Sequence, residues 1–189
     1  MMTKRDRLLH TALKLFIERG IDATATASIA QKSGVSVGTL FYHFKNKEEL
    51  VLVLCRQIND SLYSYRDSHI RQCTSLFEEL YGLWHVAIEW ATRHVDYFNF
   101  MECCLLSGSH RSSEKHQIVQ EYFDRDSWFI TASQSDNMKT NDLSYIREHF
   151  IWNIRMNITF FIEFPEKLTP ENIERSFQIY WHGISSDRS

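Results

Sequence analysis

Side chains suited to contacting phosphates and bases recur in one short stretch of the chain. Ser36, Thr39, Tyr42 and His43 supply hydroxyl and imidazole groups, and Lys47 adds an ammonium. At about 100° per residue, the first four fall on one side of a helix. These groups are donors and acceptors of the kind that bind phosphate oxygens and base edges, so the stretch predicts a nucleic-acid contact surface.

Two short helices separated by a tight turn are predicted to position these groups. Thr26 is expected to cap a helix that runs through Ser33, and Gly34 to adopt the left-handed turn that ends it. Ser36 can then cap the second helix, which gives the punctuation of a helix-turn-helix. The opposite side of that second helix is predicted to pack inward through Val37, Leu40, Phe41 and Phe44.

A preceding helix is expected to serve as the packing platform for this pair. Thr3 with Asp6 forms a capping-box pattern, and an apolar stripe then continues at helical spacing until Gly20. The stripe should cover four apolar residues of the helix-turn-helix, namely Ile29, Val35, Leu40 and Phe44.

A long helix is predicted to follow. Asn46 can cap it, with Glu49 in the capping-box position, and no glycine or proline interrupts the chain before about His69. Lys47 would then lie in the first turn beside unpaired backbone N–H groups, a position that suits a phosphate. Such a helix could transmit motion from one domain to the next, or act as a rigid connector.

The punctuation residues resemble the DNA-binding signature of the tetracycline-repressor (TetR) family over about residues 5 to 51. The matching positions are Gly20, Thr24, Ile29-Ala30, Gly34-Val35-Ser36, Gly38-Thr39-Leu40, Tyr42-His43-Phe44, Lys47-Glu48 and Leu50. Two positions depart: Ala25 stands where the family often has a hydroxyl residue, and Phe41 where it usually has tyrosine. The resemblance implies an operator-binding regulator with a helical ligand domain behind the DNA-binding unit.

Roles on double-stranded DNA can be assigned within this stretch. Phosphate contacts are expected from Thr26, Tyr42, Lys47 and the helix N-termini, including the one that Ser36 caps. Base contacts are expected from Val37, Thr39 and His43 at the start of the recognition helix, where Val37 offers only an apolar contact.

Composition supports an all-α protein whose basic end binds DNA. The 189 residues include only two prolines and six glycines. Residues 1–47 hold eight Lys/Arg against three Asp/Glu, a charge of +5, so the remainder must carry −8 of the net −3. No apolar run reaches the roughly 20 residues of a membrane span, and no signal core is present, so a cytoplasmic location without a membrane partner is expected.

The predicted organisation is a helix-turn-helix domain at 1–47 and a helical ligand-binding and dimerisation domain at 48–189, with about nine helices in all. Later helices are expected at about 75–92, 94–106, 112–134, 142–163 and 170–185. Family members usually dimerise through their last two helices. The residues predicted for a homodimer interface are Phe150, Ile154, Ile158, Phe161, Ile162, Ile173, Phe177, Tyr180, Trp181 and Ile184, with ordinary intrachain core as the alternative.

Aromatic residues are dense between the DNA-binding unit and these last helices. Most must be core, yet Trp and Tyr with polar tips also build apolar pockets with a few orienting groups. The residues predicted to bind a ligand are Trp84, Phe100, Cys104, Tyr122 and Trp128. No strongly charged cluster accompanies them, so the expected effector is an apolar or aromatic small molecule.

Sequence patterns typical of enzymes and metal sites are missing. The four cysteines show no CxxC spacing, and the nine histidines form neither Glu-x-x-His nor His-Glu-x-x-His. No cofactor, metal site or enzymatic activity is predicted, although the adjacent Cys103 and Cys104 leave thiol sensing open. The sequence thus predicts a repressor released from a palindromic operator by its effector. The alternative is a helical small-molecule-binding protein or enzyme with a non-functional DNA-binding fold.

Overall fold

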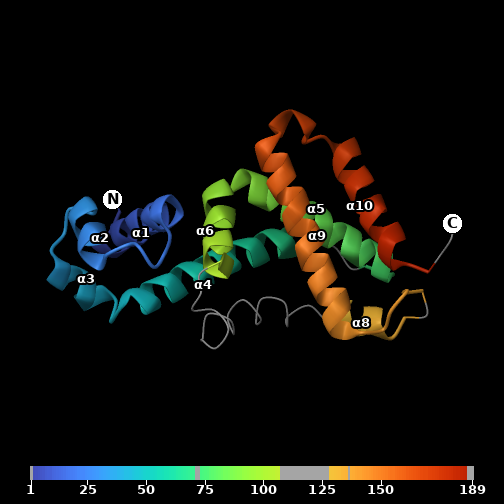
Figure 1. Cartoon of the computed structure of the whole chain (residues 1–189), viewed down its shortest axis with the longest axis horizontal. Coiled ribbons are helices and arrows are strands. Elements are labelled where there is room, and N and C mark those ends of the chain that lie inside the picture. The colour runs from blue at the N-terminus through green and yellow to red at the C-terminus, as the bar shows by residue number, and fades with distance from the viewer. Residues whose placement is uncertain (1, 71–72, 107–127, 136, 187–189) are drawn as a thin grey trace. The chain divides into compact units, whose positions relative to one another are not determined.

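The computed structural model describes residues 2–70, 73–106, 128–135 and 137–186. Within these ranges the regular secondary structure is helical, with one isolated antiparallel bridge between Met138 and Ser185, which confirms the predicted all-α class. The elements in chain order are α1 (Lys4–Arg19), α2 (Thr26–Lys32), α3 (Val37–His43), α4 (Lys47–His69), α5 (Leu76–Arg93), α6 (Val95–Leu106), α8 (Trp128–Ser133), α9 (Leu143–Glu163), the 3-10 helix η2 (Pro165–Lys167) and α10 (Pro170–Ile184) (Figure 1).

Most predicted boundaries agree with these elements to within a residue. The long fourth helix runs to His69 as expected, and α10 begins at Pro170 behind the capping hydroxyl of Thr169, which accepts from the Asn172 N–H. The helix predicted at 112–134 lies mostly outside the described residues, which show only α8 at its end. In the described ranges no helix combines the length and the apolar character needed to cross a membrane.

The described residues form two compact units. The first comprises those within Met1–Ser61 and His94–Phe123, and the second those within Leu62–Arg93 and Asp124–Ser189. The division falls inside α4, which is continuous across it. The predicted domain boundary after residue 47 stays a prediction.

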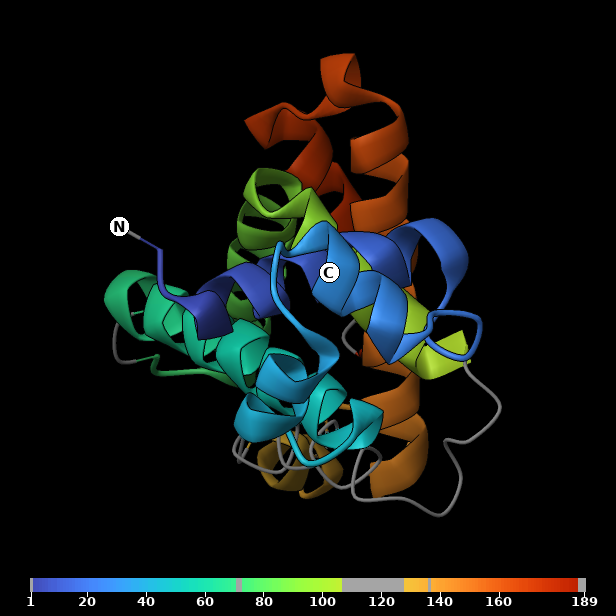
Figure 2. The same cartoon turned by 90° about the vertical axis from the view of Figure 1, so that its left-hand side faces the viewer.

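In the first unit, α1 packs against α2, α3 and α6. Figure 2 shows α1 and α6 crossing closely. The Thr3 and Asp6 capping box is present, and Gly20 ends α1 with a φ of 83°, a conformation that glycine adopts without steric cost. The α1 stripe is buried apart from Ile17, which is half-buried. Ile29, Leu40 and Phe44 are buried as predicted, whereas Val35 is half-buried.

The start of α2 differs from the prediction. Its N-cap is Ala25, with extended backbone and no side-chain hydrogen bond, so Thr26 is the first helical residue rather than the cap. The Ala25 carbonyl accepts from the N–H groups of Ser28 and Ile29, and this early closure places Thr26 within the helix. A residue without a side-chain acceptor therefore stands at the cap.

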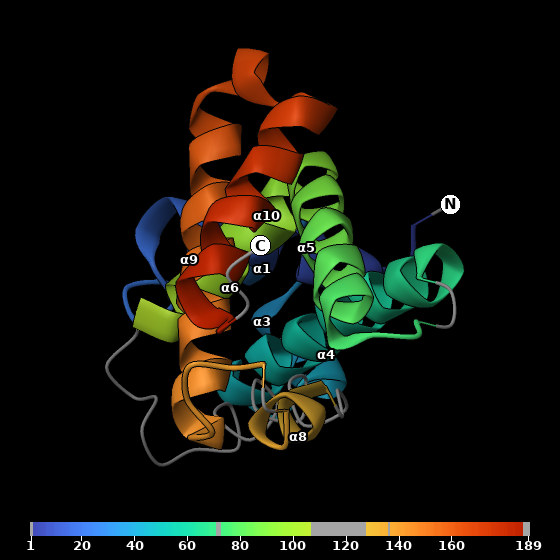
Figure 3. The same ribbon diagram turned by 90° about the vertical axis from the view of Figure 1, so that its right-hand side faces the viewer.

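In the second unit, α5 packs against α8, α9 and α10. The views in Figures 1 and 3 agree on the neighbouring positions of α5, α9 and α10. Trp84 of α5 is fully buried, with its ring against Phe150, Phe177 and Tyr180 and its Nε1–H donating to Ser176 Oγ at 2.9 Å. This indole is the centre of the second core.

Candidate nucleic-acid interface

Very few side chains anchor the recognition helix α3 in the core of the first unit. Leu40 and Phe44, four residues apart, are buried, whereas Val37 and Phe41 are exposed. The prediction that Val37 and Phe41 pack inward is therefore wrong. Phe41 lies about 100° around the helix from Leu40, and Val37 lies in the first turn. This short helix therefore packs against the core through Leu40 and Phe44 alone. Tyr42 is 85% exposed.

A hydroxyl pair starts this helix. Ser36 Oγ accepts from the Thr39 N–H at 3.1 Å, which confirms the predicted cap, and lies 2.9 Å from Thr39 Oγ1. Gly34 precedes it with a φ of 66°, as the turn requires. The exposed face of α3 thus presents a fixed Ser36–Thr39 pair close to the helix N-terminus.

Two aromatic rings lie at the other end of α3. His43, which is half-buried, meets the Tyr42 ring edge-on with centroids 5.2 Å apart. Thr26 of α2 is also half-buried. The structure therefore leaves every predicted base-contacting and phosphate-contacting residue of α2 and α3 at least partly accessible.

Lys47 has partners that the sequence did not indicate. Its ammonium donates to the backbone carbonyls of Ile21, Asp22 and Thr24 at 2.9, 3.2 and 3.3 Å. An ammonium has three N–H donors, so all three are used within the chain. The geometry makes Lys47 a clamp that holds the α1–α2 connection against the start of α4, and its phosphate contact stays a prediction.

The cap of α4 is only half of the predicted capping box. Asn46 Oδ1 accepts from the Glu49 N–H at 2.8 Å, as expected. The Glu49 carboxylate, however, accepts from the N–H of Lys45 instead of that of Asn46. The carboxylate therefore secures the residue that precedes the cap and still braces the turn between α3 and α4.

The predicted ligand residues that the structure describes belong to two different units, and their role in ligand binding stays a prediction. Trp84 lies in the core of the second unit, whereas Phe100 and Cys104 are buried in the first. Phe100 packs on Phe16 with ring centroids 6.0 Å apart, and Cys104 Sγ lies 3.8 Å from Cys55 Sγ. Tyr122 and the side chain of Trp128 lie outside what the structure describes.

The predicted dimer residues are corrected by their burial. Nearly all of them face the core of their own chain, so the intrachain alternative holds for Phe150, Ile154, Ile158, Phe161, Ile173, Phe177, Tyr180 and Ile184, while Ile162 and Trp181 are half-buried. Phe177 is in contact with a ring of aromatic neighbours from α5 and α10. Core packing thus uses this apolar face, and it is not available for a partner.

A different face of α9 and α10 exposes large apolar side chains, and it was missed. We call it the α9–α10 face: Trp152, Met156, Phe160 and Ile179, which are 60%, 62%, 43% and 72% exposed. The α9 members recur every four residues, so the signal was present in the sequence. It was hidden because α9 is apolar on two sides, and periodicity does not say which side a core takes.

A polar cluster joins α5 to α10 inside the second unit. The Tyr81 hydroxyl donates to the Glu174 carboxylate, and this bond, with burial, raises the pKa of Tyr81 to about 12. Hydrogen bonds from Gln178 and Tyr81 lower the pKa of Glu174. Burial lowers the pKa of His85 from its ordinary 6.5, and the buried Nε2 of that ring has no hydrogen-bond partner.

His85 predicts an acid-sensitive contribution to stability. Because its folded pKa lies below the unfolded value of 6.5, the unfolded chain binds more protons. The contribution is therefore present above pH 6.5 and is lost as the pH falls through the folded pKa. Urea midpoints at pH 7.5 and 5.0 should differ less for His85→Gln than for the wild type. The exposed His10→Gln is the control, and equal differences in both variants would contradict the assignment.

Comparison with known proteins agrees with this geometry. Residues 8–54 match the family described as "Bacterial regulatory proteins, tetR family". The chain is 36% identical over 87 residues to the HTH-type transcriptional repressor KstR2 of Mycolicibacterium smegmatis, which is 46% of this chain and 42% of the relative. The match therefore spans less than half of that protein.

Solved structures extend the likeness to the whole fold. A TetR-family transcription regulator from Shewanella sp. PV-4 superposes with a TM-score of 0.84 at 23% identity, covering 98% of this chain and all of that one. KstR2 of Mycobacterium tuberculosis, a ketosteroid transcriptional regulator, gives 0.64 at 20% identity and covers 99% and 97%. The helix-turn-helix at residues 8–54 therefore belongs to the TetR family of bacterial regulatory proteins, and the chain as a whole shares the fold of these solved structures.

Proposed function

We propose that this chain is a homodimeric, effector-responsive transcriptional repressor that binds a palindromic operator in the cytoplasm. The observation behind the proposal is α3, which buries Leu40 and Phe44 and turns Val37, Phe41 and Tyr42 outward on a basic N-terminal unit. These exposed apolar and aromatic residues favour a bound partner, and the positive charge of residues 1–47 favours DNA. The KstR2 relative is itself a repressor.

Contacts with DNA divide between positioning and base reading. Thr26, Tyr42 and the Ser36-capped N-terminus of α3 contact phosphates, and Val37, Thr39 and His43 reach base edges. Residues 1–47 would form the part that grips DNA, and residues 48–189 the part that binds the effector and the second copy. In this proposal Lys47 acts indirectly, by holding the elements that present α3.

Binding to a palindromic duplex should weaken steeply with salt. Contacts with phosphates release counterions, so the logarithm of the binding constant should fall linearly with the logarithm of salt concentration. The duplex would be selected from a random pool and titrated by fluorescence anisotropy at 50 to 200 mM salt. Affinity that does not change with salt, or no selected duplex at all, would favour a helical ligand-binding protein with an inert DNA-binding fold.

Thr39→Ala and His43→Ala should each cost about 1–3 kcal/mol on the selected duplex while sparing random DNA. Both residues lie on the exposed side of α3 without filling the core, so the loss would report base reading. Gln31→Ala, exposed on α2, is the matched control in the same titration. Equal losses on selected and random duplexes would remove Thr39 and His43 from the bases.

The second copy is assigned to the α9–α10 face. Four large apolar side chains of α9 and α10 are exposed, and a closed symmetric pair would bury the same residues on both copies. Arg155, whose guanidinium lies 4.4 Å from the Trp152 ring centroid, borders the patch. Two joined copies would present two α3 helices to the two half-sites of a palindrome.

The effector is proposed to be an apolar or aromatic small molecule. Support comes from the aromatic second unit, rich in Trp, Tyr and Phe with few charges among the buried residues. One structural relative is named for ketosteroid regulation, which is an apolar ligand class for that protein. Thermal-shift screening against apolar and aromatic compounds, followed by anisotropy with operator, would test whether a bound compound releases DNA.

A further inference from the structure

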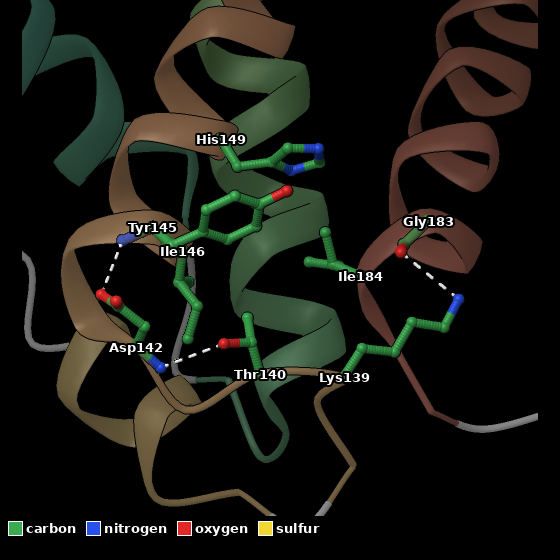
Figure 4. A pocket seen from close by; sticks show the side chains of 8 residues that line it. All are labelled: Lys139, Thr140, Asp142, Tyr145, Ile146, His149, Gly183 and Ile184. Carbon is green, nitrogen blue, oxygen red and sulfur yellow. Dashed lines mark hydrogen bonds between the residues drawn. The ribbon is translucent and has the colours of Figure 1, made fainter.

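A pocket lies between the start of α9 and the end of α10, wholly within the second unit. Its volume is about 420 Å³, within the range that accommodates a small organic ligand. Figure 4 shows Tyr145 and His149 projecting from α9 toward the side where Ile184 of α10 lies, and Ile146 pointing toward the segment that holds Thr140. The segment that leads into α9 closes the remaining side with Lys139, Thr140 and Asp142.

One residue that lines this pocket carries a buried polar atom without a hydrogen-bond partner. His149 Nδ1 is buried without a hydrogen-bond partner, and its ring lies between those of Tyr145 and Tyr180, with both centroids 5.6 Å away. The hydroxyls of Tyr180 and of Ser185, which follows the pocket residue Ile184, are also buried without partners. A buried polar atom without a partner destabilises the folded chain, so a bound hydrogen-bonding group would stabilise the site.

The charged residues of the lining are already engaged. The Lys139 ammonium donates to the carbonyls of His182 and Gly183 at 2.7 and 3.3 Å, which satisfies the end of α10. The Asp142 carboxylate caps α9 by accepting from the Tyr145 N–H at 3.0 Å. One positive and one negative group, both bound within the chain, give no net charge with which to select an ion.

These observations define the ligand chemistry. Ile146 and Ile184 supply apolar walls, and Tyr145 and His149 supply flat rings. The imidazole nitrogen accepts or donates according to its tautomer, and a hydroxyl can serve either case. We propose that the pocket binds an uncharged aromatic molecule bearing one hydroxyl, with its ring between the isoleucines and its hydroxyl on His149 Nδ1.

Helix α9 links this pocket to the face through which the chain is proposed to dimerise. Tyr145 and His149 lie on the same side of α9 as Trp152 and Met156, because these positions follow one another at steps of three or four residues. A ligand against His149 would therefore border the α9–α10 face and shift the equilibrium between copies. This consequence rests on the proposed function, whereas the binding itself does not.

The test uses 2-naphthol as the probe on the full chain, without DNA. Nitrogen-15 spectra of the histidine rings should show the His149 signal, assigned by its loss in His149→Phe, shifting on titration. His149→Phe keeps a flat ring and should weaken 2-naphthol about tenfold while leaving naphthalene, which lacks the hydroxyl, unchanged. Gly183→Leu is a second, independent variant: a Cβ at Gly183 meets no atom within 4 Å, so the larger side chain should fit and weaken both probes.

Three results would overturn the proposal. They are a His149 signal that does not move, equal affinity for naphthalene and 2-naphthol, and binding that appears only after the α9–α10 face is disrupted. The last result would mean that a second copy of the chain fills the pocket. Because operator binding is measured separately, a failed pocket would leave the proposed DNA-binding function untouched, and a failed operator titration would leave the pocket standing.

Discussion

Met156→Arg combined with Ile179→Arg should yield a monomer with operator affinity weakened about 10²–10⁴-fold, the advantage that joining two binding sites provides. Both side chains are largely exposed, so the substitutions leave the core intact. In a symmetric interface each new charge would lie near its copy, unpaired and deprived of water. Sedimentation at micromolar concentration should change from about twice 22.5 kDa to 22.5 kDa.

Two further variants separate dissociation from unfolding. Phe177→Glu alters a fully buried residue, and a charge left unpaired in that aromatic core should abolish the thermal transition instead of producing a folded monomer. Ile130→Arg, which changes an exposed apolar residue of α8 outside the α9–α10 face, should stay dimeric. A dimer that survives the double substitution, or a wild-type monomer at high concentration, would refute the assigned interface.

Lys47→Met should destabilise the first unit by about 1–3 kcal/mol, because the carbonyls of Ile21, Asp22 and Thr24 lose a shared donor. Methionine keeps the length of the stem, so the change isolates the ammonium. Operator affinity should fall by a similar factor at every salt concentration. Urea unfolding measures the first effect, and anisotropy titrations across salt measure the second.

The salt slope distinguishes a clamp from a phosphate contact. If Lys47 holds the α1–α2 connection, the slope of log affinity against log salt should match that of the wild type. If it binds a phosphate in the complex, the slope should flatten by about one unit. Lys45→Met removes an exposed ammonium two residues away and should leave stability within about 0.5 kcal/mol of the wild type. A flattened slope with unchanged stability would reject the clamp.

Local punctuation explains why the helix-turn-helix could be predicted. The glycines at 20 and 34 have positive φ, and Thr3, Ser36 and Thr169 cap the helices expected of them, because these structures depend on residues within a turn of one another. The error at Thr26 arose within the same rules. Ala25 occupies the cap position because its carbonyl accepts the first hydrogen bonds of α2. Capping propensity alone would favour Thr26 over Ala25.

Contacts between side chains that are distant in the sequence depend on how the helices pack, not on local sequence. The Lys47 clamp joins residues more than twenty positions apart, and Trp84 reaches Ser176 across 92. The predicted ligand residues were grouped by their place in the sequence, yet Trp84 and Phe100 belong to different units. Pattern alone does not tell which of several apolar side chains become neighbours, because that depends on how the helices cross.

By itself the sequence determined the all-α class, most helix boundaries, the turn and cap that begin α3, and the basic charge of residues 1–47, since each follows from composition or from spacing within a few residues. The tertiary structure alone decided which face of α9 and α10 stays exposed, what Lys47 binds and where His149 is left without a partner. A helix that is apolar on two sides has two ways to meet its core. Only packing against α5 buries Phe150 and Phe177 and leaves Met156 and Ile179 exposed.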